Sequence, residues 1–142
     1  IIASAPTIDD IVATPTGFLS TVLDANGNQT ATLVASGSNR RAVTIDEIPK
    51  NLQHAFVAIE DERFYEHNGI DVTGIIRAGV KGVASGFHFS EGASTITQQL
   101  LKNTVFTSWT SESSMADKFE RKFQEQYLAL QLEKVVDTDW IL

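Results

Sequence analysis

The chain has 142 residues, 42 % of them hydrophobic, and a formal net charge of −7. This length is enough for one domain with a hydrophobic core, and the acidic balance argues against a general nucleic-acid-binding protein, which is normally basic. The absence of cysteine excludes disulfides, thiol catalysis and cysteine-ligated metals. No apolar run approaches the roughly 20 residues that span a bilayer, so we expect a soluble protein or a part of a longer chain.

Residues 1–45 are predicted to contain a β-hairpin. This segment is rich in Thr, Ser, Val, Ala and Gly, and two β-prone runs flank Asp-Ala-Asn-Gly-Asn at residues 24–28. An Asn-Gly pair between such runs is a strong hairpin signal. Pro49 follows shortly, and residues 46–142 are predicted to form a second, helical section.

Hydrophobic periodicity predicts helices throughout this second section. Besides a helix around residues 52–59, we expect helices from about 71 to 84, over 94–106 with Ser94 as N-cap, and from about 112 to 135. The residues expected to form apolar faces in the core are Leu52, Ala55, Phe56, Ile59, Val72, Ile75, Ile76, Val80, Val83, Met115, Phe119, Phe123, Tyr127 and Leu130. The last residues predict a turn, a cap at Thr138 and the first turn of a helix, which favours a fragment of a longer protein.

Three consecutive acids, Glu60, Asp61 and Glu62, follow the first of these helical patterns. Only one or two of them can face any one cleft, because neighbours on a helix point about 100° apart. A carboxylate beside an apolar face and Phe64 can have its pKa raised by desolvation, which suits a general acid or base. The other interpretation, which composition alone favours, is a charged helix end in water.

His67, a few residues later, is a candidate metal ligand by residue type alone. No second histidine follows at the spacing of a zinc-binding helix, and His54 lies far along the preceding face. We therefore expect His67 to fix the turn before Gly69 through hydrogen bonds.

Two further polar groups stand out. Ser94, Gln98 and Lys102 are four residues apart and form one polar helix face, which suits sugar hydroxyls and a phosphate or is simply the solvent side of an amphipathic helix. Glu125 follows Arg121 by four residues and Lys122 by three, so the three share a helix surface. They form either an intrahelical ion pair or a carboxylate held between cations that bind an anionic leaving group.

Taken in order, these segments resemble the three motifs of the peptidoglycan glycosyltransferase (transglycosylase) domain of class A penicillin-binding proteins and monofunctional transglycosylases, glycosyltransferase family 51. The matching positions are Glu60, Asp61, Phe64, His67 and Gly69 in the first motif, Gly92, Ser94, Thr95, Ile96, Thr97, Gln98, Gln99, Lys102 and Asn103 in the second, and Arg121, Lys122 and Glu125 in the third. The resemblance covers about two thirds of the chain, residues 46–142. It implies a mainly α, lysozyme-like fold and an incomplete domain.

The resemblance implies polymerisation of lipid II into β-1,4 glycan strands, with inversion at the anomeric carbon and release of undecaprenyl pyrophosphate. Glu60 is then the catalytic base, and Glu125 is the second catalytic glutamate. Lys102, Arg121 and Lys122 neutralise the pyrophosphate. Other residues implied to bind substrate are Asp61, Phe64, Ser94, Gln98, Gln99 and Asn103. Mg²⁺ or Mn²⁺ is a further hypothesis, with Asp61 or Glu125 as the ligand.

The implied substrate is lipid-linked, so the site is expected at the membrane surface, on the extracytoplasmic face of a bacterial cell membrane. Aromatic residues in predicted loops either dip into the headgroup region or pack as local core; these are Phe87, Phe89, Phe106 and Trp109. Moenomycin-type inhibitors are expected ligands, and apolar surface left by an incomplete lobe would allow a homodimer.

Two other functions stay open on these residues. A lysozyme-like enzyme that cleaves glycan would also need a glutamate in a helical cleft, although its leaving group gives no reason for the cationic residues. A non-catalytic module that binds a cell-wall precursor or an antibiotic is the second alternative.

Overall fold

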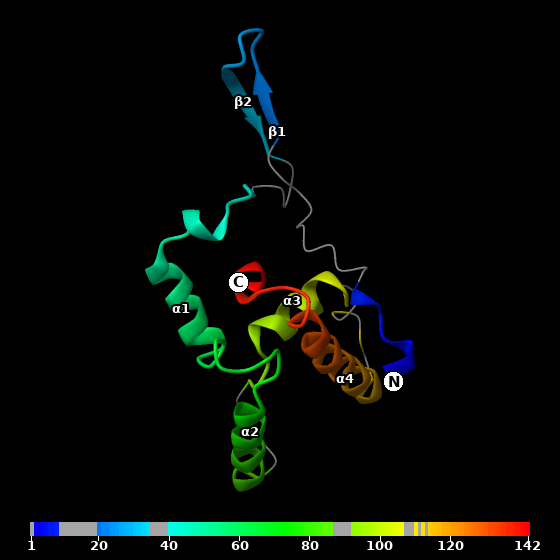
Figure 1. Cartoon of the computed structure of the whole chain (residues 1–142). Helices are drawn as coiled ribbons and strands as arrows, with labels where there is room; N and C mark the ends of the chain where they lie inside the picture. Colours follow the sequence, from blue (N-terminus) through cyan, green and yellow to red (C-terminus); the bar gives the residue numbers. More distant parts are fainter. Residues whose placement is uncertain are drawn as a thin grey trace. The chain divides into compact units, whose positions relative to one another are not determined.

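The structure is a computed structural model that describes residues 2–8, 20–34, 40–86, 92–106, 110, 112 and 114–142. The chain divides into two compact units. One unit contains the hairpin and the turn up to Ile48, and the other contains the helices after Pro49 together with residues 2–8. Figure 1 shows their elements, and each unit is described by itself.

The smaller unit is built on the predicted hairpin. Strands β1 (Ser20–Leu23) and β2 (Gln29–Leu33) pair antiparallel, with Ser20 opposite Leu33. The Asp24 carboxylate accepts hydrogen bonds from the backbone N–H groups of Asn26 and Asn28 at 2.8 and 2.9 Å, and Gly27 has a φ of 84°. The positive φ, which glycine adopts without steric cost, explains why the Asn-Gly pair predicts this turn correctly. A short 3-10 helix, η3 (Ile45–Glu47), ends the unit.

The larger unit is helical, as predicted. Its elements are η1 (Ile2–Ser4), α1 (Lys50–Glu60), α2 (Val72–Ala84), α3 (Ile96–Thr104), α4 (Met115–Leu132) and α5 (Thr138–Ile141). Helices α3 and α4 pack against each other, and Figure 1 shows them side by side. The chain is therefore mainly α, with a short hairpin before the helical lobe. Among the described residues, no helix combines the length and the apolar character that crossing a membrane requires.

Two helix caps differ from the prediction by one residue. Thr95, not Ser94, caps α3: its backbone is extended and its hydroxyl accepts a hydrogen bond from the Gln98 N–H. Asp137, not Thr138, caps α5, and its carboxylate accepts from the Trp140 N–H at 2.8 Å. Serine, threonine and aspartate are all preferred N-cap residues, so residue type alone does not decide which of two such neighbours caps the helix.

The core consists of two small clusters of buried side chains. Leu101 of α3 packs with Leu128, Ala129 and Leu132 of α4, and a second cluster joins Val57, Phe64 and Ile141. Leu100 and Val136 are partly buried against both clusters. Each fully buried large side chain stabilises the fold by roughly 1.5–3 kcal/mol relative to exposure, so these few residues hold α1, α3, α4 and α5 together.

The predicted apolar faces are largely wrong as core assignments. One residue from each predicted apolar face illustrates this: Val80 of α2 is 65 % exposed, Phe119 of α4 is 62 % exposed and Phe56 of α1 is 58 % exposed. Helix α4 turns Gln124, Glu125, Leu128 and Leu132 inward instead. Because α4 carries apolar residues on more than one face, hydrophobic periodicity identifies the helix but not the face that is buried.

Gly69 lets the loop after α1 approach α4 closely. Its φ is 86°, and a Cβ at this position would lie 2.6 Å from the backbone oxygen of Ala129. The hydroxyl of Thr95 also donates a hydrogen bond of 2.7 Å to the Gly69 carbonyl. A side chain at position 69 is therefore excluded by both backbone strain and sterics.

The first described residues pack on α4 rather than with the hairpin. The Ser4 hydroxyl donates to Glu120 at 3.1 Å and accepts from the Gln124 side chain at 3.2 Å. Ile8 is partly buried against the cluster around Leu128. Residues 2–8 therefore belong to the same compact unit as the helices.

Candidate active site

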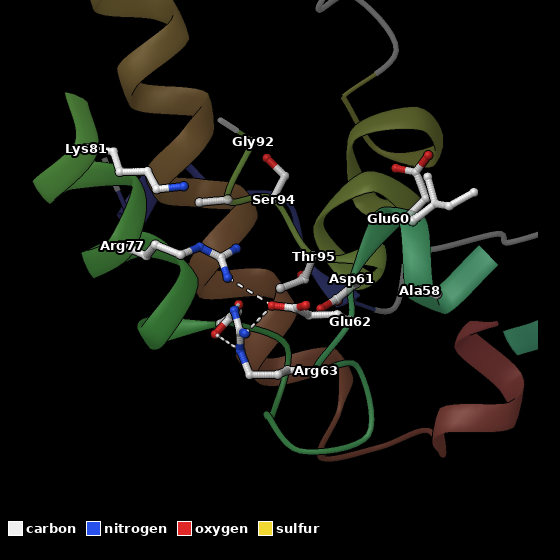
Figure 2. A pocket seen from close by; sticks show the side chains of 13 residues that line it. Ala58, Glu60, Asp61, Glu62, Arg63, Arg77, Lys81, Gly92, Ser94 and Thr95 are labelled. Atoms are coloured by element: carbon white, nitrogen blue, oxygen red, sulfur yellow. Dashed lines mark hydrogen bonds and ion pairs between the residues drawn. The ribbon is translucent and has the colours of Figure 1, made fainter. Parts of the chain in front are cut away.

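A pocket of about 410 Å³ opens where the first and second sequence motifs meet (Figure 2). The end of α1, the loop after it, α2 and the segment before α3 line this pocket. The charged and hydroxyl side chains among its lining are Glu60, Asp61, Glu62, Arg63, Asp71, Arg77, Lys81, Ser94 and Thr95.

Glu60 is the last residue of α1 and its side chain is exposed at the pocket. The Gln99 side-chain amide donates a hydrogen bond of 2.8 Å to Glu60 Oε2. The desolvation expected beside an apolar face is not found, because both Glu60 and its neighbour Ile59 are exposed. Glu60 is thus an accessible carboxylate whose orientation is set by the hydrogen bond from the Gln99 side chain.

The buried side chains of Asp61 and His67 form a hydrogen-bonded pair in the segment that follows Glu60. His67 Nε2 lies 3.0 and 2.9 Å from the two Asp61 oxygens, and Asp61 Oδ2 also accepts from the Ile96 N–H at 3.1 Å. His67 Nδ1 accepts from the Gly69 N–H at 3.2 Å. Since Nδ1 is an acceptor, the ring proton is on Nε2 and points at Asp61. The hydrogen-bonding role predicted for His67 is confirmed, and Asp61 links the end of α1 to the start of α3.

Phe64, expected at the substrate, lies in the core. Its side chain is 2 % exposed and packs with Val57 and Ile141. Its ring also meets those of Tyr65 and His67 edge-on, at centroid distances of 5.2 and 6.3 Å. Phe64 therefore supports the loop that carries Asp61 and His67, and it does not reach the pocket.

A network of charges that the sequence analysis missed crosses the floor of the pocket. Arg63 pairs with Asp71 through two nitrogens, and both Arg63 and Arg77 donate to Glu62 Oε1, the latter at 2.9 Å. Asp71 also caps α2 by accepting from the Gly74 N–H at 2.9 Å. Glu62 and Arg77 are 15 residues apart in the sequence, so no helical spacing rule predicts that they pair. The only local sequence signal for this network is Asp71, which is of a residue type that commonly caps helices.

This network predicts a loss of stability in acid. The hydrogen bonds from Arg63 outweigh burial and hold the pKa of Asp71 below its ordinary value. Because the folded-state pKa is depressed, the stabilisation is present above the unfolded pKa of about 4 and is lost as the pH falls through the folded-state pKa. We expect Asp71→Asn to be less stable than the unmodified protein at pH 7 and to lose less stability between about pH 5 and pH 2.

Urea unfolding at several pH values measures this difference. Asp139→Asn, which removes an exposed acid in α5, is the matched control and should follow the unmodified protein. Parallel pH profiles for Asp71→Asn and the unmodified protein would contradict the assignment.

The third motif forms a cluster that reaches the pocket through Ser94. Lys122 Nζ donates to Ser94 Oγ at 2.8 Å and to Glu125 Oε2 at 2.9 Å, and Arg121 pairs with Glu125 Oε1. Glu125 is 0 % exposed, so both of its oxygens are occupied by cations and sheltered from water. The shared helix surface is confirmed, and Glu125 positions the two cations from beneath them.

Arg121 has a second acidic partner in Glu112. Its Nε lies 2.7 and 3.0 Å from the two Glu112 oxygens. Burial alone would lower the pKa of Arg121, but the hydrogen bonds to Glu112 and Glu125 outweigh it and raise the pKa above its ordinary value. Arg121 is therefore a permanent cation held on both sides by carboxylates.

The remaining predicted residues lie on α3. Gln98 is 2 % exposed, so its face is not the solvent side of an amphipathic helix, and its Nε2 has no hydrogen-bond partner within the part of the chain that the structure describes. Lys102 is half-buried and Asn103 is exposed, and neither lines the pocket. The structure thus brings Ser94 to the pocket and Gln99 to Glu60, while Gln98, Lys102 and Asn103 lie elsewhere on α3.

The residues expected to hold Mg²⁺ or Mn²⁺ do not fit a metal cage. Asp61 is committed to His67 and the Ile96 N–H, and Glu125 to Arg121 and Lys122. No group of three or more His, Cys, Asp or Glu suitable for a metal occurs in residues 2–8, 20–34, 40–86, 92–106, 110, 112 and 114–142. A cation held by one carboxylate and substrate phosphates would need no such cage.

Of the aromatic residues expected near a membrane, Phe87, Phe89 and Trp109 lie outside the described residues. Phe106 is partly buried against the cluster of Leu101 and Leu128. Of the two alternatives predicted for Phe106, packing as local core is therefore the one that the structure supports.

Comparison with known proteins gives one consistent family. The chain matches the transglycosylase family over residues 26–142. It is 46 % identical to penicillin-binding protein 1A of Clostridium perfringens (strain 13 / Type A) over 145 aligned residues, which cover 100 % of this chain and 20 % of that protein. It is 42 % identical to penicillin-binding protein 1A/1B of Bacillus subtilis (strain 168) over 99 % of this chain and 14 % of that protein. The chain thus spans a fifth or less of the length of these relatives.

Proposed function

The chain belongs to the transglycosylase family, and from this premise we propose that it polymerises lipid II into β-1,4-linked glycan strands and releases undecaprenyl pyrophosphate. One observation carries the proposal. Ser94 lines the pocket that Glu60 also lines, and the same Ser94 hydroxyl binds Lys122 of the cationic cluster. An exposed carboxylate and an anion-binding group therefore serve one pocket.

The chemistry follows from these two groups. Glu60 takes the proton of the acceptor's sugar 4-hydroxyl, and the oxygen attacks the anomeric carbon of the donor from the face opposite to the pyrophosphate. The bond to the pyrophosphate oxygen breaks as the new glycosidic bond forms, so the anomeric centre inverts in a single displacement without a covalent enzyme intermediate. Gln99 holds the carboxylate in the orientation that this proton transfer requires.

The leaving group needs stabilisation of its developing charge. Lys122 and Arg121 supply positive charge for this. Lys102, which the resemblance implies for the same role, lies on α3 outside the lining of the pocket. Glu125 orients Lys122 and Arg121 from below rather than exchanging protons with the substrate, because its oxygens are enclosed. Dependence on Mg²⁺ or Mn²⁺ stays a prediction.

The alternatives are less well supported. A glycan-cleaving, lysozyme-like enzyme would use Glu60 but would leave the cationic cluster without a purpose. A non-catalytic module that binds lipid II or moenomycin-type inhibitors would use the cluster but would not need Glu60 to be oriented by Gln99. Binding of moenomycin-type inhibitors is expected of the transglycosylase as well, at the cationic cluster.

The membrane contact that a lipid-linked substrate requires is assigned to α2. Its exposed aliphatic side chains are Val72, Ile75, Ile76, Val80 and Val83, and its charged residues are Arg77 and Lys81. A helix that combines exposed aliphatic and basic residues suits the boundary between headgroups and acyl chains. We accordingly propose that the protein acts at the extracytoplasmic face of a bacterial membrane. A homodimer that buries the exposed apolar stripe of α4 is a second proposal for the role of exposed apolar surface.

Incubation of the purified protein with fluorescently labelled lipid II tests the proposal. We expect polymer on a gel, and its formation should stop when unlabelled moenomycin is added. Cleavage of pre-formed glycan without polymerisation would support the lysozyme-like alternative, and saturable binding without turnover would support the binding module.

A further inference from the structure

Arg121, one of the two cations assigned to the leaving group, is already bound by a carboxylate from outside its own helix. Its Nε lies 2.7 and 3.0 Å from the two oxygens of Glu112, which therefore occupies this edge of the guanidinium. Little of either side chain reaches water, since 12 % of Arg121 and 14 % of Glu112 is exposed. Glu112 is not among the motif positions on which the sequence resemblance rests. The simplest explanation of the contact is an ion pair that only stabilises the fold.

The charge balance of the cluster indicates more than that. Arg121 and Lys122 are two cations, and Glu112 and Glu125 are the two carboxylates that contact them. These formal charges cancel, although the proposed reaction requires positive charge where the pyrophosphate leaves. The cluster gains a net positive charge when one of the two carboxylates withdraws.

Glu112 is the carboxylate that is able to withdraw. Glu125 lies inside α4, is 0 % exposed and binds both cations. Glu112 precedes the N-cap Ser114, so the backbone hydrogen bonds of α4 do not hold it. A carboxylate and a phosphate both bind a guanidinium through parallel N–H···O hydrogen bonds. Glu112 and a phosphate group would therefore compete for the same edge of Arg121.

We propose that Glu112 is an intramolecular competitor of the donor pyrophosphate. Its carboxylate occupies Arg121 in the empty site and is displaced when pyrophosphate binds, and no covalent bond forms or breaks in this exchange. In the empty site Glu112 keeps a mostly buried guanidinium paired, which avoids the cost of an unpaired buried charge. In the filled site its return favours release of the leaving group. This inference rests on the proposed function, because that function supplies the pyrophosphate.

Isothermal titration calorimetry with inorganic pyrophosphate tests the competition without turnover. Glu112→Gln should bind pyrophosphate roughly three- to tenfold more tightly than the unmodified protein does. It should also melt at a lower temperature, because the ion pair with Arg121 is lost. A purely structural ion pair predicts the same loss of stability with unchanged or weaker binding. Asp117→Asn removes the same charge from an exposed acid in the first turn of α4, and its pyrophosphate affinity should stay near that of the unmodified protein.

Nuclear magnetic resonance of the Arg121 Nε–H group follows the displacement directly. Its signal, identified by its loss in Arg121→Lys, should shift when pyrophosphate is added to the unmodified protein. In empty Glu112→Gln the same N–H should exchange faster with water, and added pyrophosphate should slow that exchange. A signal of Arg121 that does not respond to pyrophosphate would show that Glu112 stays in place, against the proposal.

Equal or weaker pyrophosphate binding by Glu112→Gln, or no binding by either protein, would also overturn this role of Glu112. In the polymerisation assay Glu112→Gln should lower the apparent KM for lipid II, whereas Asp117→Asn should not. If both proteins bind pyrophosphate as expected but neither makes polymer, the proposed function is wrong and the competition at Arg121 still holds.

Discussion

Glu60→Gln is expected to lower the rate of lipid II polymerisation by about 10²- to 10⁴-fold, the range for loss of a general base. Glutamine keeps the size of the side chain and can still meet the Gln99 amide, but it cannot accept the proton of the attacking hydroxyl. Because Glu60 is exposed and contributes no core packing, stability should change little. Pyrophosphate binding should be unaffected, since the base does not contact the leaving group.

Polymerisation kinetics and calorimetry on the same preparations measure both parts of this expectation. Glu66→Gln is the matched control, because Glu66 is an exposed acid in the same loop that does not line the pocket. Gln99→Leu should give an intermediate loss in kcat, as it removes the hydrogen bond that orients Glu60. Polymerisation by Glu60→Gln at the rate of the unmodified protein would remove Glu60 from the role of base.

The sequence identifies the elements and the motif residues better than it identifies what is buried. Three predictions that depend on local spacing agree with the structure. They are the hairpin around Asn26 and Gly27, the hydrogen bond of His67 at the Gly69 turn, and the contacts of Glu125 with Arg121 and Lys122 on α4. Local spacing also predicts that Glu125 lies next to Arg121 and Lys122. It does not predict that Glu125 lies beneath them, since that depends on how α4 packs against α3.

Burial fails as a prediction where a helix is apolar on several faces. Phe119 and Phe123 continue a regular stripe on α4, yet the structure buries Leu128 and Leu132 of the same helix and leaves the stripe exposed. The same holds for α2, where the aliphatic residues are exposed and Gly74 and Gly82 are buried. The partner surface decides which face is covered, and pairs such as Glu62 and Arg77 form only after tertiary packing.

Glu125→Gln is expected to have the second large effect, on both stability and turnover. The carboxylate is enclosed and neutralises two cations, and removing one partner of a buried ion pair costs about 3 kcal/mol or more in the free energy of unfolding. Turnover should fall by about 10²-fold, as for loss of an electrostatic group at a leaving group, because Lys122 and Arg121 lose their fixed positions. Urea unfolding and polymerisation kinetics measure the two effects.

The control for this variant is Glu112→Gln, which removes the other carboxylate on Arg121 but leaves Lys122 bonded to Glu125. It should cost less stability and less turnover than Glu125→Gln. Pyrophosphate binding in Glu125→Gln should be equal or tighter, since a negative charge is lost beside two cations. Unchanged stability and turnover in Glu125→Gln would show that Glu125 does not position the cations.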